Sequence, residues 1–160
     1  MRIVAVFVLF LVLSGCSVSG SKFVYSSVGE TENILYFYRT PGFFMAGASP
    51  ILSVNDSIIG PLRRGRSYIV PVEGQSCKVS VTDNPNDLVT WNSEKQDINF
   101  EIDLSNVNER FYEFKAGFSG MVVPIGPAFV PMGTNNYKFV EQKKDEALPR
   151  LHKTKTENVE

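Results

Sequence analysis

The chain has 160 residues, and its 16 Lys and Arg against 17 Asp and Glu give a formal net charge of −1 at pH 7. This balance predicts no nucleic-acid partner, because domains that bind nucleic acid carry a basic patch or stripe. The length fits one domain. Hydrophobic residues make up 43% of the chain and include twelve Phe, which is enough for an ordinary core.

An apolar run, IVAVFVLFLVL, occupies residues 3–13 directly after Arg2. It is too short to cross a bilayer as a helix, which takes about 20 residues. A basic start, a short apolar stretch and a small-residue end are typical of a secretory signal peptide. We therefore expect residues 1–15 to be removed. The mature chain would have 160 − 15 = 145 residues, with 15 basic and 17 acidic side chains and a net charge of −2.

The apolar run ends in Leu13, Ser14, Gly15 and Cys16, a string that resembles the lipobox of bacterial lipoproteins. The resemblance implies a diacylglycerol on the sulfur of Cys16 and cleavage by a dedicated peptidase just before it. Leu13 is an apolar anchor, and the small Ser14 and Gly15 let both enzymes approach the backbone. Two acyl chains suffice for stable membrane anchoring. By similarity to Gram-negative lipoproteins, Ser17 in place of Asp favours the outer membrane, with the domain facing the periplasm.

Residues 16–32 form the expected lipidated tether, which starts with a flexible Ser/Gly stretch. NILYFYR at 33–39 is rich in aromatic and branched residues and is followed by a Thr-Pro-Gly turn, which predicts a strand. PILSVNDSIIG at 50–60 predicts two short strands around Asn55-Asp56, whose side chains suit a turn.

The segment 66–81 repeats this scheme, with its turn at Glu73-Gly74. Pro71 within it suggests a sheet edge or a bulge. DINFEIDL at 97–104 alternates apolar and polar residues with a period of two. This alternation predicts a strand with one buried face and one wet face. The positions expected on the buried face are Ile98, Phe100, Ile102 and Leu104.

Two further strands are expected at 110–118 and 136–142. The apolar segment 120–133 lies between them and is interrupted by three prolines, so we expect no long regular strand there. An exposed apolar patch of this kind would mark a partner contact, and the alternative is that it pads one end of the core. The residues of this candidate partner surface are Val122, Val123, Phe129 and Met132.

The final segment, 143–160, holds Pro149, five basic and four acidic residues, and little apolar content, so a solvated and partly disordered tail is expected. The seven or eight short strands before it predict an all-β fold over 33–142. The expected architecture is a single antiparallel β-sandwich or a small open barrel.

Three stretches follow one another in a familiar order: ILYFYR, then ILSVNDSIIGPLRRGRSYIVPVEGQSCKVSV, then INFEIDLSNVNERFYEFKAG. Together they resemble a group of bacterial lipoprotein domains of unknown function. The shared features are an opening strand ending near Tyr-x-Tyr-Arg, a V-N-D/G-x-x-I-G hairpin and a V-x-P-G turn, for which this chain has VEGQ. The middle third is also similar to short PEGA-type β modules. The resemblance covers roughly 33–142 and implies a lipid-anchored β-sandwich in the cell envelope, with no assigned activity.

No pattern in the chain predicts a catalytic, cofactor-binding or metal site. The one histidine, His152, lies in the charged tail, and no His or Cys cluster has zinc spacing. Glu101 and Asp103 share a strand face about 7 Å apart, which would suit paired-carboxylate hydrolysis, although a wet strand face explains them equally. Cys77 is either a small buried apolar residue or an odd, reactive thiol.

The basic run RRGR at 63–66 could meet anionic head groups or form a solvated turn. Arg39, at the end of the first strand, could cap a buried carboxylate or face solvent. Taken together, the sequence predicts a non-enzymatic accessory or binding module, bound to the membrane through acyl chains on Cys16, with an envelope protein as partner. The alternatives are a carrier of a small apolar or lipid ligand and, less favoured, an envelope hydrolase.

Overall fold

The computed structural model describes residues 20–26, 33–42, 47–87, 97–106, 108–125 and 128–157, and over 118–136 it describes the backbone alone. The predicted signal peptide and the lipobox residues Leu13, Ser14, Gly15 and Cys16 lie outside the described residues, so the lipid anchor stays a prediction. Within the described residues, no helix is both long enough and apolar enough to pass through a bilayer.

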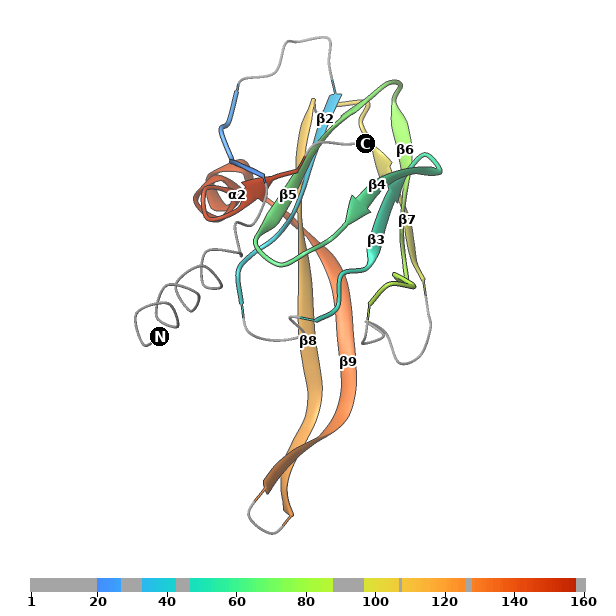
Figure 1. The fold of residues 1–160 in the computed structure, drawn as a ribbon. Helices are drawn as coiled ribbons and strands as arrows, with labels where there is room; N and C mark the ends of the chain where they lie inside the picture. Colours follow the sequence, from blue (N-terminus) through green and yellow to red (C-terminus); the bar gives the residue numbers. More distant parts are fainter. Residues whose placement is uncertain are drawn as a thin grey trace, which may run out of the picture.

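Two sheets form the body of the molecule, and neither closes into a barrel (Figure 1). The six-stranded sheet has the order β1 (Ser21–Lys22), β10 (Lys155–Thr156), β5 (Arg66–Val72), β2 (Asn33–Arg39), β8 (Glu109–Ile125) and β9 (Ala128–Gln142). The four-stranded sheet has the order β4 (Ser57–Pro61), β3 (Ile51–Val54), β6 (Ser76–Thr82) and β7 (Ile98–Asp103). The predicted all-β sandwich is thus confirmed. Its strands are not all antiparallel, however, because β2 pairs with β8 and β10 with β5 in parallel.

The β3–β4 hairpin forms where the sequence predicts it. Asn55 and Asp56 have φ angles of 49° and 62°, the left-handed values that a two-residue hairpin turn requires and that Asn and Asp tolerate. The side-chain oxygen of Asn55 also accepts a hydrogen bond of 2.9 Å from the backbone N–H of Lys78. The turn residue therefore ties the hairpin to β6 as well as closing it.

The strands predicted within 66–81 are present as β5 and β6, but they do not pair with each other. β5 pairs with β2 in the six-stranded sheet, whereas β6 pairs with β3 and β7 in the other. The turn at Glu73-Gly74 therefore carries the chain from one sheet to the other. Pro71 pairs with β2 on one side, while β10 reaches only Arg66 and Ser67 on the other. Among the described strands, Pro71 therefore borders an open edge, as predicted.

The main core fills the space between the two sheets. Burial of one large aliphatic or aromatic side chain contributes roughly 1.5–3 kcal/mol, so this layer supplies most of the driving force for folding. Strand β7 shows the predicted alternation, with Glu101 and Asp103 exposed. On its inner face Ile102 and the following Leu104 are buried, whereas Ile98 and Phe100 are half-buried. Cys77 is only 2% exposed and belongs to this core, as a small apolar residue would. Other members are Leu35, Phe37, Leu52, Val70, Val79, Val81, Tyr112 and Phe114.

The other face of the six-stranded sheet is covered by α2 (Lys144–Leu151), so the prediction of a solvated tail is wrong. Ala147 and Leu151 are spaced four apart and lie on one helix face, and both are fully buried. They pack on Tyr36, Tyr38 and other aromatic residues of the sheet. The composition of the segment does not reveal this small apolar stripe, because many charged residues surround it in the sequence. It also explains why β2 reads as a continuous aromatic run, since β2 is buried on both faces.

The prediction that prolines interrupt 120–133 is also wrong, because β8 and β9 form one long hairpin there. Their register continues to the pair Ile125↔Ala128 and includes Pro124↔Phe129 and Val122↔Pro131. A two-stranded ribbon leaves every second backbone N–H pointing outward, away from its partner strand. A proline can replace such a residue without loss of a ladder hydrogen bond, which is why prolines are found at edges.

Candidate functional site

The β8–β9 hairpin extends well past the sheet to which it belongs. β2 pairs with β8 only as far as Glu113, whereas the pairing of β8 with β9 runs on to Ile125. The hairpin thus continues for 125 − 113 = 12 further residues of β8, along which no third strand from the described residues pairs with it. We name this extension, residues 114–125 and 128–139, the arm. Figure 1 shows it running away from the rest of the molecule.

Aromatic packing holds the root of the arm against the sandwich core. The ring of Phe139 lies 5.3 Å from that of Phe114, 5.5 Å from that of Phe37 and 5.6 Å from that of Phe100. The ring of Tyr137 stacks on Phe114 at 5.9 Å. Aromatic pairs of this kind contribute about 0.5–1.5 kcal/mol each beyond their burial. The direction in which the arm leaves the body is therefore set by the core.

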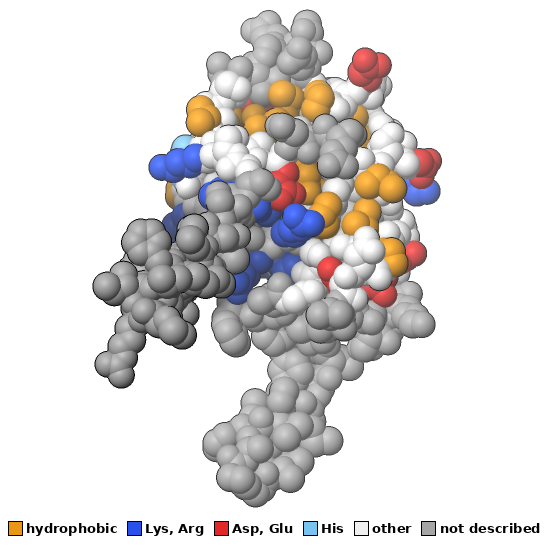
Figure 2. Space-filling model, viewed as in Figure 1, with side chains coloured by type: hydrophobic (Ala, Val, Ile, Leu, Met, Phe, Trp, Pro, Cys, Tyr) orange, Lys and Arg blue, Asp and Glu red, His pale blue; other side chains and the backbone are white. Residues whose placement is uncertain are grey.

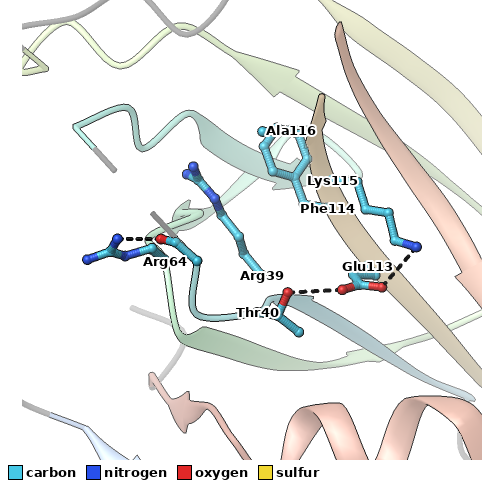
Figure 3. A pocket seen from close by; sticks show the side chains of 8 residues that line it. Arg39, Thr40, Arg64, Glu113, Phe114, Lys115 and Ala116 are labelled. Atoms are coloured by element: carbon cyan, nitrogen blue, oxygen red, sulfur yellow. Dashed lines mark hydrogen bonds and ion pairs between the residues drawn. The ribbon is translucent and has the colours of Figure 1, made fainter. Parts of the chain in front are cut away.

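A cleft of about 280 Å³ lies beside this root (Figure 3). Three of its lining side chains are cationic and one is acidic. The lining residues are Arg39, Thr40, Gly42, Arg64, Glu113, Phe114, Lys115 and Ala116. They come from the end of β2 and the loop after it, the loop before β5, and β8 where the arm begins, which are segments far apart in the sequence.

Arg39 is 4% exposed, which excludes the solvent-facing alternative considered for it. One of its guanidinium nitrogens donates hydrogen bonds to the carbonyl oxygens of Ala48, at 2.5 Å, and Leu62, at 3.1 Å. The guanidinium carbon lies 5.8 Å from the centre of the Phe114 ring. Burial lowers the pKa of Arg39 because the charged form loses hydration. This side chain joins the loops at the root of the arm.

Glu113, also 4% exposed, connects three parts of the fold. Its carboxylate accepts a hydrogen bond of 3.1 Å from the hydroxyl of Thr40, lies 3.4 Å from the ammonium of Lys115, and forms an ion pair with Arg150 of α2. Close by, burial raises the pKa of Tyr38 and the charge of Glu113 raises it further. The charges of the cleft are used to hold segments together, so we assign the cleft a structural role at the base of the arm.

The sequence-predicted partner residues Val122, Val123, Phe129 and Met132 all occur in the arm. The register places them in adjoining pairs, Val122↔Pro131, Val123↔Val130, Pro124↔Phe129 and Met121↔Met132. The pairing of β8 with β9 thus brings the stretch 121–124 next to the stretch 129–132 near the end of the hairpin. Their side chains lie outside the described part of the structure, so the choice between interface and core stays a prediction.

The residues considered for chemistry are not assembled into a catalytic group. Glu101 and Asp103 are both exposed, and the pKa of Asp103 is lowered because its carboxylate accepts hydrogen bonds from Ser105. His152 is exposed and contacts the ring of Phe23 edge-on at 5.7 Å. Burial raises the pKa of the Cys77 thiol. In the described part of the chain, no three His, Cys, Asp or Glu side chains lie close enough to hold a metal ion.

A second hollow, which sequence analysis missed, is a groove of about 750 Å³ where the edges of the two sheets face each other. β4 supplies apolar residues on one side, and β1 and β10 supply the other side. Tyr68 is buried there, and its hydroxyl bonds the carbonyl of Pro61 at 3.0 Å and the carboxylate of Glu157 at 2.6 Å. The residues that line it are Gly20, Ser21, Ile51, Ile58, Ile59, Gly60, Pro61, Arg63, Tyr68, Thr156 and Glu157.

The fold and its most prominent feature define a class: a β-sandwich covered by one helix on its outer face, with a two-stranded arm that projects from the body. Comparison of the chain with protein-family models, curated proteins and solved structures finds no match. Its function is therefore inferred from its own sequence and geometry.

Proposed function

We propose that this chain is an envelope lipoprotein, anchored in the outer membrane through acyl chains on Cys16, that binds a partner protein through its arm and is not an enzyme. The observation that carries the proposal is the arm itself, which continues for 12 residues of β8 beyond the last pair with β2. A two-stranded ribbon alone is at best marginally stable in water. A partner that covers the arm would supply the missing burial.

The composition of the arm supports a protein contact. The segment 120–133 consists of apolar residues, glycine and proline, with no charged side chain. Contiguous apolar surface on a soluble domain marks a site of interaction. Strands at an open edge also offer unpaired N–H and C=O groups to an added strand. The acyl anchor would raise the effective concentration of the arm at the membrane, so that a weak contact becomes sufficient.

The test is photo-crosslinking in cells that express the full chain. A photoreactive residue at Val123 should give an adduct with one specific envelope protein, whereas the same residue at the exposed Lys78 of β6 should not. Cys16→Ser should abolish acylation and release the chain from the membrane fraction. If a membrane-bound, folded chain yields no protein adduct at Val123, the arm does not bind a partner.

Charged replacements then separate interface from core. With the photoreactive residue moved to Phe129, which pairs with Pro124, Val122→Asp together with Val123→Asp should remove the adduct and leave the unfolding midpoint and the acylation unchanged. A variant that fails to fold would instead support the alternative in which 120–133 pads the core. Lys138→Asp, at an exposed position nearer the root of the arm, is the matched control and should change neither the adduct nor the midpoint.

The groove between the sheet edges favours one second candidate, a carrier of a small apolar ligand. Its volume of about 750 Å³ and its wall of Ile51, Ile58 and Ile59 suit a short acyl chain. A fluorescent fatty-acid analogue should then bind the full chain saturably, and Ile58→Asp, at an exposed position of the groove wall, should weaken its binding at least tenfold. An analogue that does not bind at saturating concentration excludes this function.

A further inference from the structure

One edge of the six-stranded sheet gathers positive charge in a chain that is nearly neutral. The edge is built from residues 20–26, 62–67 and 152–157, which include six Lys or Arg and a single carboxylate, Glu157, for a net charge of 6 − 1 = +5. The whole chain has a net charge of −1. We name the exposed cations among them, Lys22, Arg63, Arg64, Lys153 and Lys155, the basic edge.

Backbone pairing brings the basic edge together from three distant segments. Lys22 of β1 lies directly opposite Lys155 of β10, and Lys155 in turn lies opposite Arg66 of β5. The N–H of Lys155 donates a hydrogen bond of 2.9 Å to the carbonyl of Gly65, which directly follows Arg64. Three neighbouring strands thus carry a cation at the same level, and Lys and Arg side chains gather at the left and centre of the face in Figure 2.

The neighbouring cations of this edge repel one another. Like charges directly opposite each other on neighbouring strands are destabilising. Arg66 is compensated by Glu157, whose carboxylate lies 3.2 Å away. That carboxylate is also bonded by Tyr68, so it is committed inside the fold rather than available to Lys22. An external anion would be attracted to this cluster of cations.

Exposed apolar side chains flank the same edge. Among the described residues, the large hydrophobic side chains that stand out in solvent are Val24, 73% exposed, and Ile58, 67% exposed. Val24 follows Phe23, whose N–H bonds the carbonyl of Thr154 beside Lys153. Ile58 lines the groove together with Gly20, Ser21 and Arg63. Basic residues beside exposed apolar ones are the combination that binds an anionic membrane surface.

The position of the tether places this edge next to the bilayer. Gly20 follows the expected lipidated residue Cys16 by four positions. Even a fully extended chain spans at most about 3.6 Å per residue, so the Cα atom of Gly20, directly before β1, would lie within about 14 Å of the Cα atom of Cys16.

We propose that the basic edge rests on the anionic lipid head groups of the membrane, with Val24 and Ile58 at the lipid boundary, so that the body has a fixed orientation on the bilayer. This inference rests on the proposed lipid anchor, but it goes beyond anchoring. A tether alone would let the body turn freely, whereas a charged contact surface selects one face.

The experiment uses acylated full-length protein in vesicles that contain spin-labelled head groups. A fluorophore is placed at Val24→Cys on the edge or at Glu101→Cys on β7, the opposite edge of the other sheet, while Cys77 stays unlabelled because it is 2% exposed. In vesicles with one quarter phosphatidylglycerol, quenching should be at least threefold stronger at position 24 than at position 101. It should fall at least twofold in pure phosphatidylcholine vesicles and in 1 M salt, where the screening length drops to about 3 Å.

Charge reversal distinguishes this surface from the tether. Lys22→Glu with Lys155→Glu should lower the quenching at position 24 at least twofold, and the matched pair Lys78→Glu with Lys138→Glu should leave it unchanged. Equal quenching at positions 24 and 101 on an acylated, vesicle-bound chain would overturn the inference and leave the anchor intact. Strong quenching at position 24 without any dependence on lipid charge would also overturn it. A chain that is not acylated would contradict the proposed function instead.

Discussion

The clearest test of the fold is Leu151→Ala in α2. Leu151 is fully buried between the helix and the aromatic residues Phe23, Tyr36 and Phe111 of the outer layer. Substitution of a buried Leu by Ala costs about 2–5 kcal/mol, and the flat rings around this site cannot move in to fill the space. Helix propensity does not oppose this loss, because Ala is at least as favourable in a helix as Leu. We therefore expect the free energy of unfolding to fall by about 3 kcal/mol.

The assay is urea denaturation followed by circular dichroism, with Leu148→Ala as the matched control in the same helix. Leu148 is only half-buried, so its replacement should cost about 1 kcal/mol or less. The slope of the transition should be the same in both variants, since neither changes the surface exposed on unfolding. If Leu151→Ala lowered the free energy of unfolding by less than about 0.5 kcal/mol, the helix would not be packed on the sheet. The solvated tail that the composition predicts would then be the correct description.

Three further outcomes are expected. Lys22→Glu should raise stability by about 0.2–1 kcal/mol in the same assay, because it converts the like-charge pair with Lys155 into an opposite-charge pair. Gly60→Ala should destabilise the protein by about 2 kcal/mol, because φ there is +142° and a Cβ atom would lie 2.6 Å from the hydroxyl of Tyr68; an unchanged melting temperature would contradict this. Burial raises the pKa of Tyr36 from 10.0 to about 12. The contribution of its neutral phenol to the free energy of unfolding is therefore complete below pH 10 and should be lost between pH 10 and 12, by up to about 1.4 kcal/mol per pH unit. Tyr36→Phe should flatten this dependence on pH.

The parts of the fold that local chemistry determines are the parts that sequence analysis predicted. The hairpin at Asn55-Asp56 depends on two residues that tolerate positive φ, and both are visible in the sequence. The alternation in β7 likewise arises from one buried and one exposed face of a single strand. Neither requires knowledge of what lies elsewhere in the chain.

The errors arise where distant segments decide the structure. Charged residues dominate the composition of 143–160. Ala147 and Leu151 nevertheless form an apolar stripe, and it is buried only because β2 presents an aromatic face on which it packs. The strands β5 and β6 are adjacent in the sequence, yet long-range pairing with β2 and β3 separates them. In the arm, the prolines predict breaks because the sequence does not reveal that no other described strand pairs with β8 or β9 there.

The candidate sites were largely hidden for the same reason. Arg39 and Glu113 are ordinary charged residues in the sequence, and their burial depends on loops and a helix that are remote from them. The basic edge combines residues from both ends of the chain with the run at 63–66, of which only that run stood out. The apolar character of 120–133, by contrast, was evident from composition alone.

The pairing of β1 with β10 has a consequence for the order of assembly. Ser21 pairs with Thr156, so 156 − 21 = 135 positions separate the partners. This short ladder cannot form until the chain has been synthesised as far as β10. It closes a very long loop and gains only two residue pairs in return. A force applied at the N-terminus would be transmitted through β1 to β10, the last strand to be delivered. The part of the body nearest the proposed anchor therefore forms late, and a chain that ends before β10 would lack it even with the rest of the sandwich in place.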